Sequence, residues 1–200
     1  MMKFLFLLFF SISLLFSQSD FEKIKVQYFK SYDYEQMGKY TEAIKVLSPL
    51  YKKYPKGYTL NLRFAWLFFL NKKYTDAIKY YKEAALINSY ALDPRLGLIR
   101  IYLETGDFEQ AESVSYELLK IDYYNYYANI YITRALIAQK KYDVALKVVR
   151  KMLSLYPTDV QYLSLLARIY KQTNSKYLQQ VYEDILILDP NNVFVRSELN

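Results

Sequence analysis

"GKYTEAIKVL", residues 38–47, is the first of four related stretches that recur at a fixed spacing along the chain. The other three are "KKYTDAIKYY" (72–81), "GDFEQAESVS" (106–115) and "KKYDVALKVV" (140–149). An alanine recurs at the same place in each stretch, with a period of 34 positions: Ala43, Ala77, Ala111 and Ala145. A fixed period of about 20 to 50 residues is typical of repeat proteins, in which each repeat is one supersecondary unit. The sequence therefore predicts a solenoid built from repeats.

The composition favours helices as the elements of these repeats. Only 4 Gly and 5 Pro occur in 200 residues, and 53% of the residues are apolar while 24% are charged. Such a balance belongs to a folded chain, and the scarcity of turn residues argues against an all-β fold. We therefore expect an all-α protein.

The residues around each stretch resemble the tetratricopeptide repeat, a 34-residue helix-turn-helix unit. In that family a small residue lies in the first helix, glycine and an aromatic residue mark the turn, alanine lies early in the second helix, and proline often closes the unit. The first repeat supplies Ser31, Gly38, Tyr40, Ala43 and Pro55 at these places. The resemblance implies a right-handed superhelical solenoid of antiparallel helix pairs.

The repeat domain is expected to span residues 20–200. It divides into about five repeats and a short C-terminal cap: 24–57, 58–91, 92–125, 126–159, 160–192 and 193–200. The fifth repeat is degenerate, because it lacks the glycine and the alanine and its Pro190 comes one residue early, which indicates a one-residue deletion in its turn.

The short cap is expected to leave an apolar edge at the C-terminal end of the solenoid. Four residues would form this edge: Ile185, Leu188, Val193 and Phe194. Uncovered apolar surface favours association, so the sequence predicts a homodimer through this edge or contact with a partner.

The N-terminus has the pattern of a secretion signal, residues 1–19. One lysine precedes an apolar run at 4–16, and small residues stand at Ser17 and Ser19, where a signal peptidase reads them. The run is shorter than the roughly 20 residues of a membrane span. We expect cleavage after Ser19 and a periplasmic or secreted product. The alternative is a protein anchored in the inner membrane by residues 4–16.

Enzyme chemistry finds little support in the residue types. The chain has no His and no Cys, which removes the usual general base, the thiol nucleophile and most transition-metal ligand sets. We expect no enzyme activity, no catalytic residue, no metal and no cofactor. The net charge of +7 favours anionic partners, but no nucleic-acid-binding motif occurs, so the sequence argues against a nucleic-acid partner.

The resemblance also implies where a partner binds, because the first helices of these repeats line the concave face. The ninth position of the repeats forms one inward column: Tyr32, Trp66, Arg100, Arg134 and Arg168. No carboxylate stands four residues from Arg134 or Arg168, so a helical ion pair does not explain these arginines. An anionic ligand does, because arginine holds carboxylates and phosphates with two parallel hydrogen bonds.

Neighbouring inward positions complete the candidate face. The candidate partner-binding residues are Tyr32, Leu62, Trp66, Phe69, Arg100, Tyr127, Arg134, Arg168 and Lys171. They predict a groove that is aromatic near its N-terminal end and basic near its C-terminal end, suited to a peptide with apolar and acidic side chains. Two plainer interpretations stay open: the arginines are an exposed, solvated column, and Trp66 packs in a seam between repeats.

The leading hypothesis is an exported, non-enzymatic scaffold that binds a peptide or partner protein in its groove. One alternative is a cell-envelope assembly factor whose arginines bind an anionic polymer such as peptidoglycan. Another is a membrane-anchored scaffold with an uncleaved N-terminus.

Overall fold

The computed structural model describes residues 20–199 of the chain, and these residues form helices joined by short turns, with no strand among them. The predicted signal segment, residues 1–19, lies outside the described residues, so its cleavage stays a prediction. No helix within residues 20–199 is long and apolar enough to cross a membrane. The chain divides into two units, the first ending at Ser89 and the second beginning at Tyr90.

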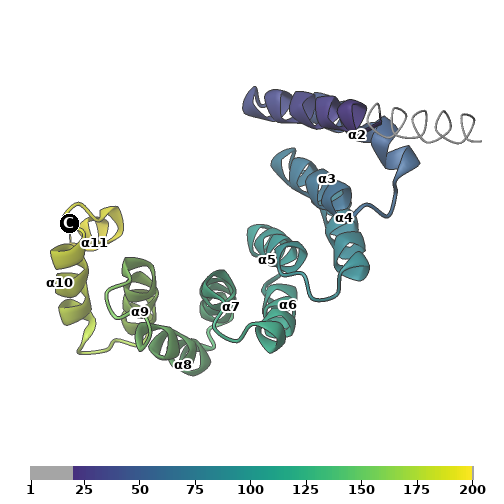
Figure 1. The fold of residues 1–200 in the computed structure, drawn as a ribbon. Helices are drawn as coiled ribbons and strands as arrows, with labels where there is room; N and C mark the ends of the chain where they lie inside the picture. Colours follow the sequence, from purple (N-terminus) through teal and green to yellow (C-terminus); the bar gives the residue numbers. More distant parts are fainter. Residues whose placement is uncertain (1–19, 200) are drawn as a thin grey trace, which may run out of the picture. The chain divides into compact units, whose positions relative to one another are not determined.

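The first unit is a stack of antiparallel helices (Figure 1). Residues 20–36 are helical and precede α2 (Tyr40–Lys53), α3 (Tyr58–Leu70) and α4 (Tyr74–Ile87). The helix α3 packs against both α2 and α4. Its residues are apolar on nearly every side because it lies between its neighbours, as expected for a helix inside a stack.

The second unit continues the same pattern of helix pairs (Figure 1). Its helices are α5 (Asp93–Thr105), α6 (Phe108–Ile121), α7 (Tyr126–Ala138), α8 (Tyr142–Leu153), α9 (Val160–Gln172), α10 (Leu178–Leu188) and α11 (Val193–Leu199). Successive helices pack together, and the first helices of neighbouring pairs also touch, α5 against α7 and α7 against α9. The predicted helical repeat solenoid is therefore confirmed.

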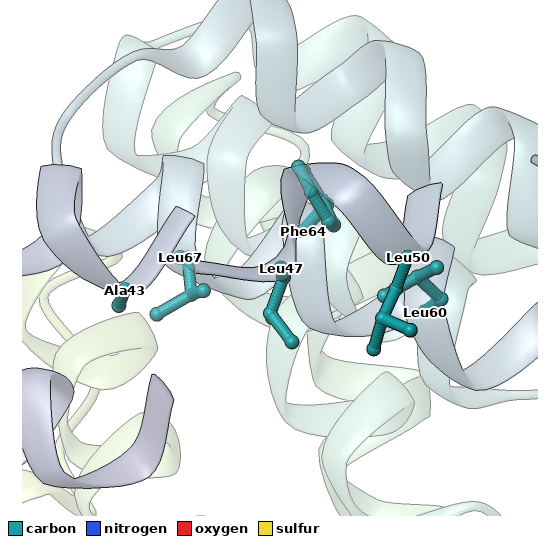
Figure 2. Packing of buried hydrophobic residues seen from close by; sticks show 6 residues of the cluster. All are labelled: Ala43, Leu47, Leu50, Leu60, Phe64 and Leu67. Atoms are coloured by element: carbon teal, nitrogen blue, oxygen red, sulfur yellow. The ribbon is translucent and has the colours of Figure 1, made fainter. Parts of the chain in front are cut away.

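The periodic alanines lie inside the packed interior of the helix stack. All four are fully buried: Ala43, Ala77, Ala111 and Ala145. A methyl side chain lets two helix backbones pack at about 8 to 10 Å, and larger neighbours fill the grooves beside it. Figure 2 shows one such seam, where the second helix of a pair meets the next first helix: Ala43, Leu47 and Leu50 of α2 with Leu60, Phe64 and Leu67 of α3.

The turn inside each helix pair has the same backbone in all five repeats. One residue per turn is left-handed, with φ between 50° and 77°, and these residues follow the period of the alanines: Gly38, Lys72, Gly106, Lys140 and Asn174. In each turn the amide of this residue and that of the next residue donate to two of the last helical carbonyls, as Lys72 donates to Phe69 and Lys73 to Phe68. This is the Schellman ending of a helix, which satisfies its free carbonyls.

The fifth repeat keeps this register up to its turn and loses it afterwards. Asn174 has the left-handed backbone of Lys140 and lies one full repeat period after it. Ile185 is fully buried like Met152, but it lies one residue less than a full period after Met152. The predicted one-residue deletion thus lies between Asn174 and Ile185.

The predicted apolar edge at the C-terminus is only partly present. The expectation that Ile185 is exposed is wrong, because α10 packs this side chain against α9. Leu188 and Val193 are exposed as expected, and Phe194 is half-buried.

Candidate functional site

Two of the predicted inward arginines frame one groove in the second unit. Arg134 of α7 and Arg168 of α9 line a groove of about 610 Å³, which is called the α7–α9 groove here. Both stand at the ninth position of their repeats, and α7 packs directly against α9. The apolar part of the lining includes three large side chains, one from each of α7, α9 and α11: Ile130, Leu165 and Phe194. The structure therefore brings Arg134 and Arg168 together over apolar surface.

The charges of these two arginines are not balanced by a carboxylate within residues 20–199. Both side chains are exposed, and neither forms an ion pair with a described residue. The guanidinium carbon of Arg168 lies 4.7 Å from the centre of the Phe194 ring, which is cation–π distance. The ring holds one face of the guanidinium and leaves its in-plane N–H groups available to an acceptor.

Lys171 belongs to a neighbouring hollow of about 340 Å³ that also contains Arg168 and Phe194. Its ammonium pairs with the carboxylate of Glu198 on α11. The hydrogen bond from Lys171 to Glu198 raises the pKa of Lys171. Of Arg134, Arg168 and Lys171, only Lys171 has its charge balanced by a carboxylate among the described residues.

The other two candidates of the second unit lie outside the α7–α9 groove lining. Arg100 is half-buried on α5, the helix that packs on the other side of α7. Tyr127 is exposed at the start of α7, and its ring contacts those of Tyr126 and Tyr131, with centroids 5.2 and 6.3 Å away. These aromatic contacts make Tyr127 part of a surface tyrosine cluster.

Trp66 and Phe69, two candidates of the first unit, take part in packing. Their rings lie 5.6 Å apart on α3, and Trp66 Nε1 donates to Glu35 Oε1 at 2.7 Å. Trp66 therefore connects α3 to the helix of residues 20–36, which is the seam role left open for it.

The other candidates of the first unit are Tyr32, on the helix of residues 20–36, and Leu62, on α3. The ring of Tyr32 covers the guanidinium of Arg63, whose carbon lies 3.9 Å from the ring centre. Leu62 is half-buried on α3. Neither side chain is among the lining residues of the α7–α9 groove, all of which belong to the second unit.

The repeat geometry agrees with comparisons to known proteins. A profile of the tetratricopeptide repeat family matches residues 68–115, the stretch that holds the second and third periodic alanines. The chain contains tetratricopeptide repeats.

A relative and two solved structures show how far this similarity extends. The TPR repeat-containing protein YsoA of Bacillus subtilis (strain 168) is 38% identical over 74 residues, which are 36% of this chain and 22% of that protein, so the chain spans about a fifth of its length. The crystal structure of a tetratricopeptide repeat protein from Parabacteroides merdae ATCC 43184 covers 87% of this chain and 70% of its own, at 18% identity and a TM-score of 0.79. MamA 41-end from Desulfovibrio magneticus RS-1 covers 86% of this chain and 97% of its own, at 12% identity and a TM-score of 0.76.

The tetratricopeptide fold supports a protein–protein interaction scaffold in general terms. Its groove offers exposed cations and apolar surface, which is chemistry for holding an anionic group beside an apolar one. Within residues 20–199, no three acidic, His or Cys side chains gather as metal ligands.

A buried ion pair in the first tetratricopeptide repeats was missed by the sequence reasoning. Arg63 is only 7% exposed, pairs with the Glu35 carboxylate and donates to Ser31 Oγ at 3.1 Å. A signal for it exists in the sequence, because Arg63 is the only charged residue of α3, "YTLNLRFAWLFFL". A lone charge in a helix that is apolar all round needs a buried partner.

Phe194 was also missed as a groove residue, since it was assigned to an outer edge. The repeat register contained the signal: once the one-residue deletion is counted, Phe194 corresponds to Gln161, a groove-lining residue of α9, just as Val193, the first residue of α11, corresponds to Val160, the first residue of α9. The short helix α11 thus places the Phe194 ring in the groove.

Proposed function

We propose that this chain is an exported, non-enzymatic scaffold that binds a partner protein through the α7–α9 groove. The observation that carries the proposal is that Arg134 and Arg168 line one groove and neither pairs with a carboxylate within residues 20–199. Stability alone gives little reason to keep two unbalanced cations on adjacent helices. An anionic ligand supplies that reason, because arginine binds carboxylates in bidentate geometry.

The partner segment we propose is a peptide with acidic and apolar side chains. Apolar surface from Ile130, Leu165 and Phe194 lies beside the two arginines. This mixture favours a peptide over an anionic polymer such as peptidoglycan, because a repeating polar polymer has no group that fills the apolar part. Affinity for the peptide depends on its sequence, whereas affinity for a polymer depends mainly on salt.

Export by the N-terminal segment 1–19 and self-association through the C-terminal edge belong to the same proposal. The pattern at 4–16 supports the first. The exposure of Ile187 and Val193, 78% and 82%, supports the second.

Photo-crosslinking in cells tests the groove. A photoreactive amino acid replaces Ala138, an exposed groove-lining residue of α7, and in a control chain it replaces Leu155, which is exposed in the turn after α8. We expect a discrete protein adduct from position 138 and none of that mass from position 155.

Two changes in the same experiment identify the role of the arginines. Replacing both, Arg134→Ala and Arg168→Ala, should abolish the adduct, while Arg150→Ala, an exposed arginine of α8, should leave it intact. An adduct that survives the double replacement would contradict the proposal. Adducts with glycan instead of protein would favour the polymer.

A further inference from the structure

A second hollow lies on the opposite face of α7. It measures about 580 Å³ and is bordered by α6, α8 and Ile132 of α7; it is called the α6–α8 hollow here. Ile132 and Arg134 are two positions apart on one helix, so their side chains point about 200° apart. A ligand in the α7–α9 groove therefore leaves the α6–α8 hollow open, and the hollow does not depend on the function proposed for that groove.

The floor of the α6–α8 hollow is apolar. Ile132 is fully buried, and Leu119 of α6 and Val148 of α8 complete the floor. Two exposed tyrosines, Tyr116 and Tyr123, stand at its rim. Tyrosine rings at the rim of an apolar hollow are well suited to packing against a side chain that enters it, because they are rigid and tolerate water at the hydroxyl.

Three lysines surround this apolar floor. Lys120 and Lys147 are exposed, Lys151 is half-buried, and none of them pairs with a carboxylate among residues 20–199. Three like charges around one hollow repel each other mildly when no anion is present. Their arrangement is complementary to an anion at the rim.

Lys151 is held in place by neutral groups only. Its ammonium donates to Asn129 Oδ1 at 2.6 Å and to the Tyr123 carbonyl at 3.1 Å, and it lies 3.9 Å from the centre of the Tyr123 ring. Partial burial lowers the pKa of Lys151. The ammonium thus has two N–H groups engaged and a third remaining, with no counter-charge among the described residues to balance it.

We propose that the α6–α8 hollow binds an acidic peptide segment of a partner protein, with one large apolar side chain in the hollow and carboxylates on Lys120, Lys147 and Lys151. The apolar side chain provides the buried anchor that interfaces need at their centre. The lysines at the rim provide charge complementarity, which speeds association and selects acidic sequences. A lipid headgroup layer fits this shape less well, because a flat surface does not fill a hollow whose floor is the buried Ile132.

Nuclear magnetic resonance with a defined probe tests this proposal. The probe is the blocked peptide Glu-Glu-Leu-Phe-Glu-Glu, added to the full ¹⁵N-labelled chain at low salt. Control peptides replace every Glu by Gln, or Leu-Phe by Ala-Ala. We expect the probe to shift amide resonances of α6 and α8 around the hollow, and each control peptide to bind at least tenfold more weakly.

Matched variants separate this hollow from the α7–α9 groove. The double variant Lys120→Glu, Lys147→Glu should lower the affinity at the hollow at least tenfold, and both side chains are exposed, so the fold is retained and circular dichroism verifies it. The double variant Lys30→Glu, Lys82→Glu, which changes two exposed lysines of the first unit, should bind as the parent does. The double variant Arg134→Ala, Arg168→Ala should leave the shifts at the hollow unchanged.

Three results would overturn the proposal. The first is equal binding of the glutamine peptide. The second is a set of shifts confined to residues of the α7–α9 groove. The third is binding to phosphatidylglycerol vesicles that requires Lys120 and Lys147 when the peptide does not bind. The photo-crosslinking at position 138 reports on the groove alone, so either proposal can fail while the other holds.

Discussion

At the scale of single residues, the left-handed turn position differs among repeats in a way that affects stability. Gly38 and Gly106 have this conformation without strain, while Lys72 and Lys140 adopt it with φ of 56° and 58°. A side chain at Cβ disfavours left-handed backbone by roughly 1 to 2 kcal/mol. The lysine turns therefore store strain that the glycine turns do not have.

Replacing Lys72 by glycine should raise the free energy of unfolding by about 1 kcal/mol, because the strain disappears. Lys79 is exposed inside α4, where the backbone is helical, so Lys79→Gly should lower the free energy of unfolding by about 0.5 to 1 kcal/mol through backbone entropy. Urea unfolding followed by circular dichroism measures both. Equal effects of the two replacements would contradict the role assigned to position 72.

A hydrogen bond between Tyr126 and Asp159 joins the start of α7 to the start of α9. The hydroxyl of Tyr126 donates to Asp159 Oδ2 at 2.9 Å, and Asp159 Oδ1 also accepts from the Tyr162 amide as the N-cap of α9. Burial, followed by this hydrogen bond, raises the pKa of Tyr126 to about 12. A tyrosine in the unfolded chain has a pKa near 10, about two units below the pKa of Tyr126 in the folded protein.

The stability that Tyr126 contributes should therefore vanish at high pH. Below about pH 10 both states keep the proton, and the contribution is complete; as pH rises towards 12 the unfolded chain loses its proton first, which favours unfolding. Tyr126→Phe should be less stable than the parent by about 1 kcal/mol at pH 8, and at about pH 12 this difference should disappear or reverse. Urea unfolding at the two pH values measures it, and a constant difference would show that the raised pKa is absent.

Sequence reasoning at this scale has a periodic signal for residues that repeat and none for residues that pair across repeats. The column of Arg134 and Arg168 follows from a single position in a 34-residue register, and the structure places both in one groove. The pair of Arg63 with Glu35 does not recur, so no periodicity marks it. The sequence left open whether Trp66 binds a partner or packs in a seam, because its hydrogen-bond partner, Glu35, lies 31 positions away.

At the scale of helices, small residues set how closely successive elements pack. Ala111 of α6 is fully buried, and α6 touches both α5 and α7. Ala111→Leu should therefore overpack this seam and lower the free energy of unfolding by about 1 to 3 kcal/mol, and Ala77→Leu should do the same in the first unit.

The matched control is Ala138→Leu, because Ala138 is exposed on α7. A surface change of this kind should alter the free energy of unfolding by less than about 0.5 kcal/mol. Urea unfolding of the three variants measures the effects. If Ala111→Leu behaved like Ala138→Leu, the role of the periodic alanine in helix packing would be wrong.

The helix pairs themselves were predictable, because turn, aromatic and alanine recur with one spacing. The C-terminal elements were less so. Ile185 was expected at the surface because the C-terminal cap is short, but the packing of α10 against α9 covers this side chain. Phe194 was assigned to the edge because α11 is a helix of only two turns, which looked too short to line a groove.

At the scale of the whole molecule, the exposed apolar residues of the C-terminal edge bear on self-association. Val193 is 82% exposed on α11 and Ile187 is 78% exposed on α10. Light scattering during size exclusion should give the mass of a dimer for the parent at high concentration. The double variant Ile187→Glu, Val193→Glu should give the mass of a monomer, because a buried charge opposes the contact.

Val144→Glu, a change at an exposed valine of α8, is the control and should keep the mass of the parent. A parent that elutes as a monomer at every concentration would reject the dimer.

The division into two units was not predicted from the sequence. The 34-residue pattern passes through residues 89 and 90 without a break in spacing, since Ala77 and Ala111 keep their register on either side. Periodicity reports what each repeat contains, and it carries no information on how completely neighbouring repeats bury each other. The candidate residues are consequently shared between the two units, four in the first and five in the second.

The helix α11 connects the groove to the end of the described chain. Its length of 7 residues is too short for a helix that is stable alone, so α11 depends on its contacts: the buried Val195, the pair of Glu198 with Lys171 and the ring of Phe194 against Arg168. A ligand in the α7–α9 groove packs on the Phe194 ring and takes the in-plane N–H groups of Arg168, so it adds a contact to α11 and removes none of these three. By thermodynamic linkage, ligand affinity and order of the last helix must then be reciprocal: a bound ligand holds α11 in place, and a chain whose last helix is frayed binds the ligand more weakly.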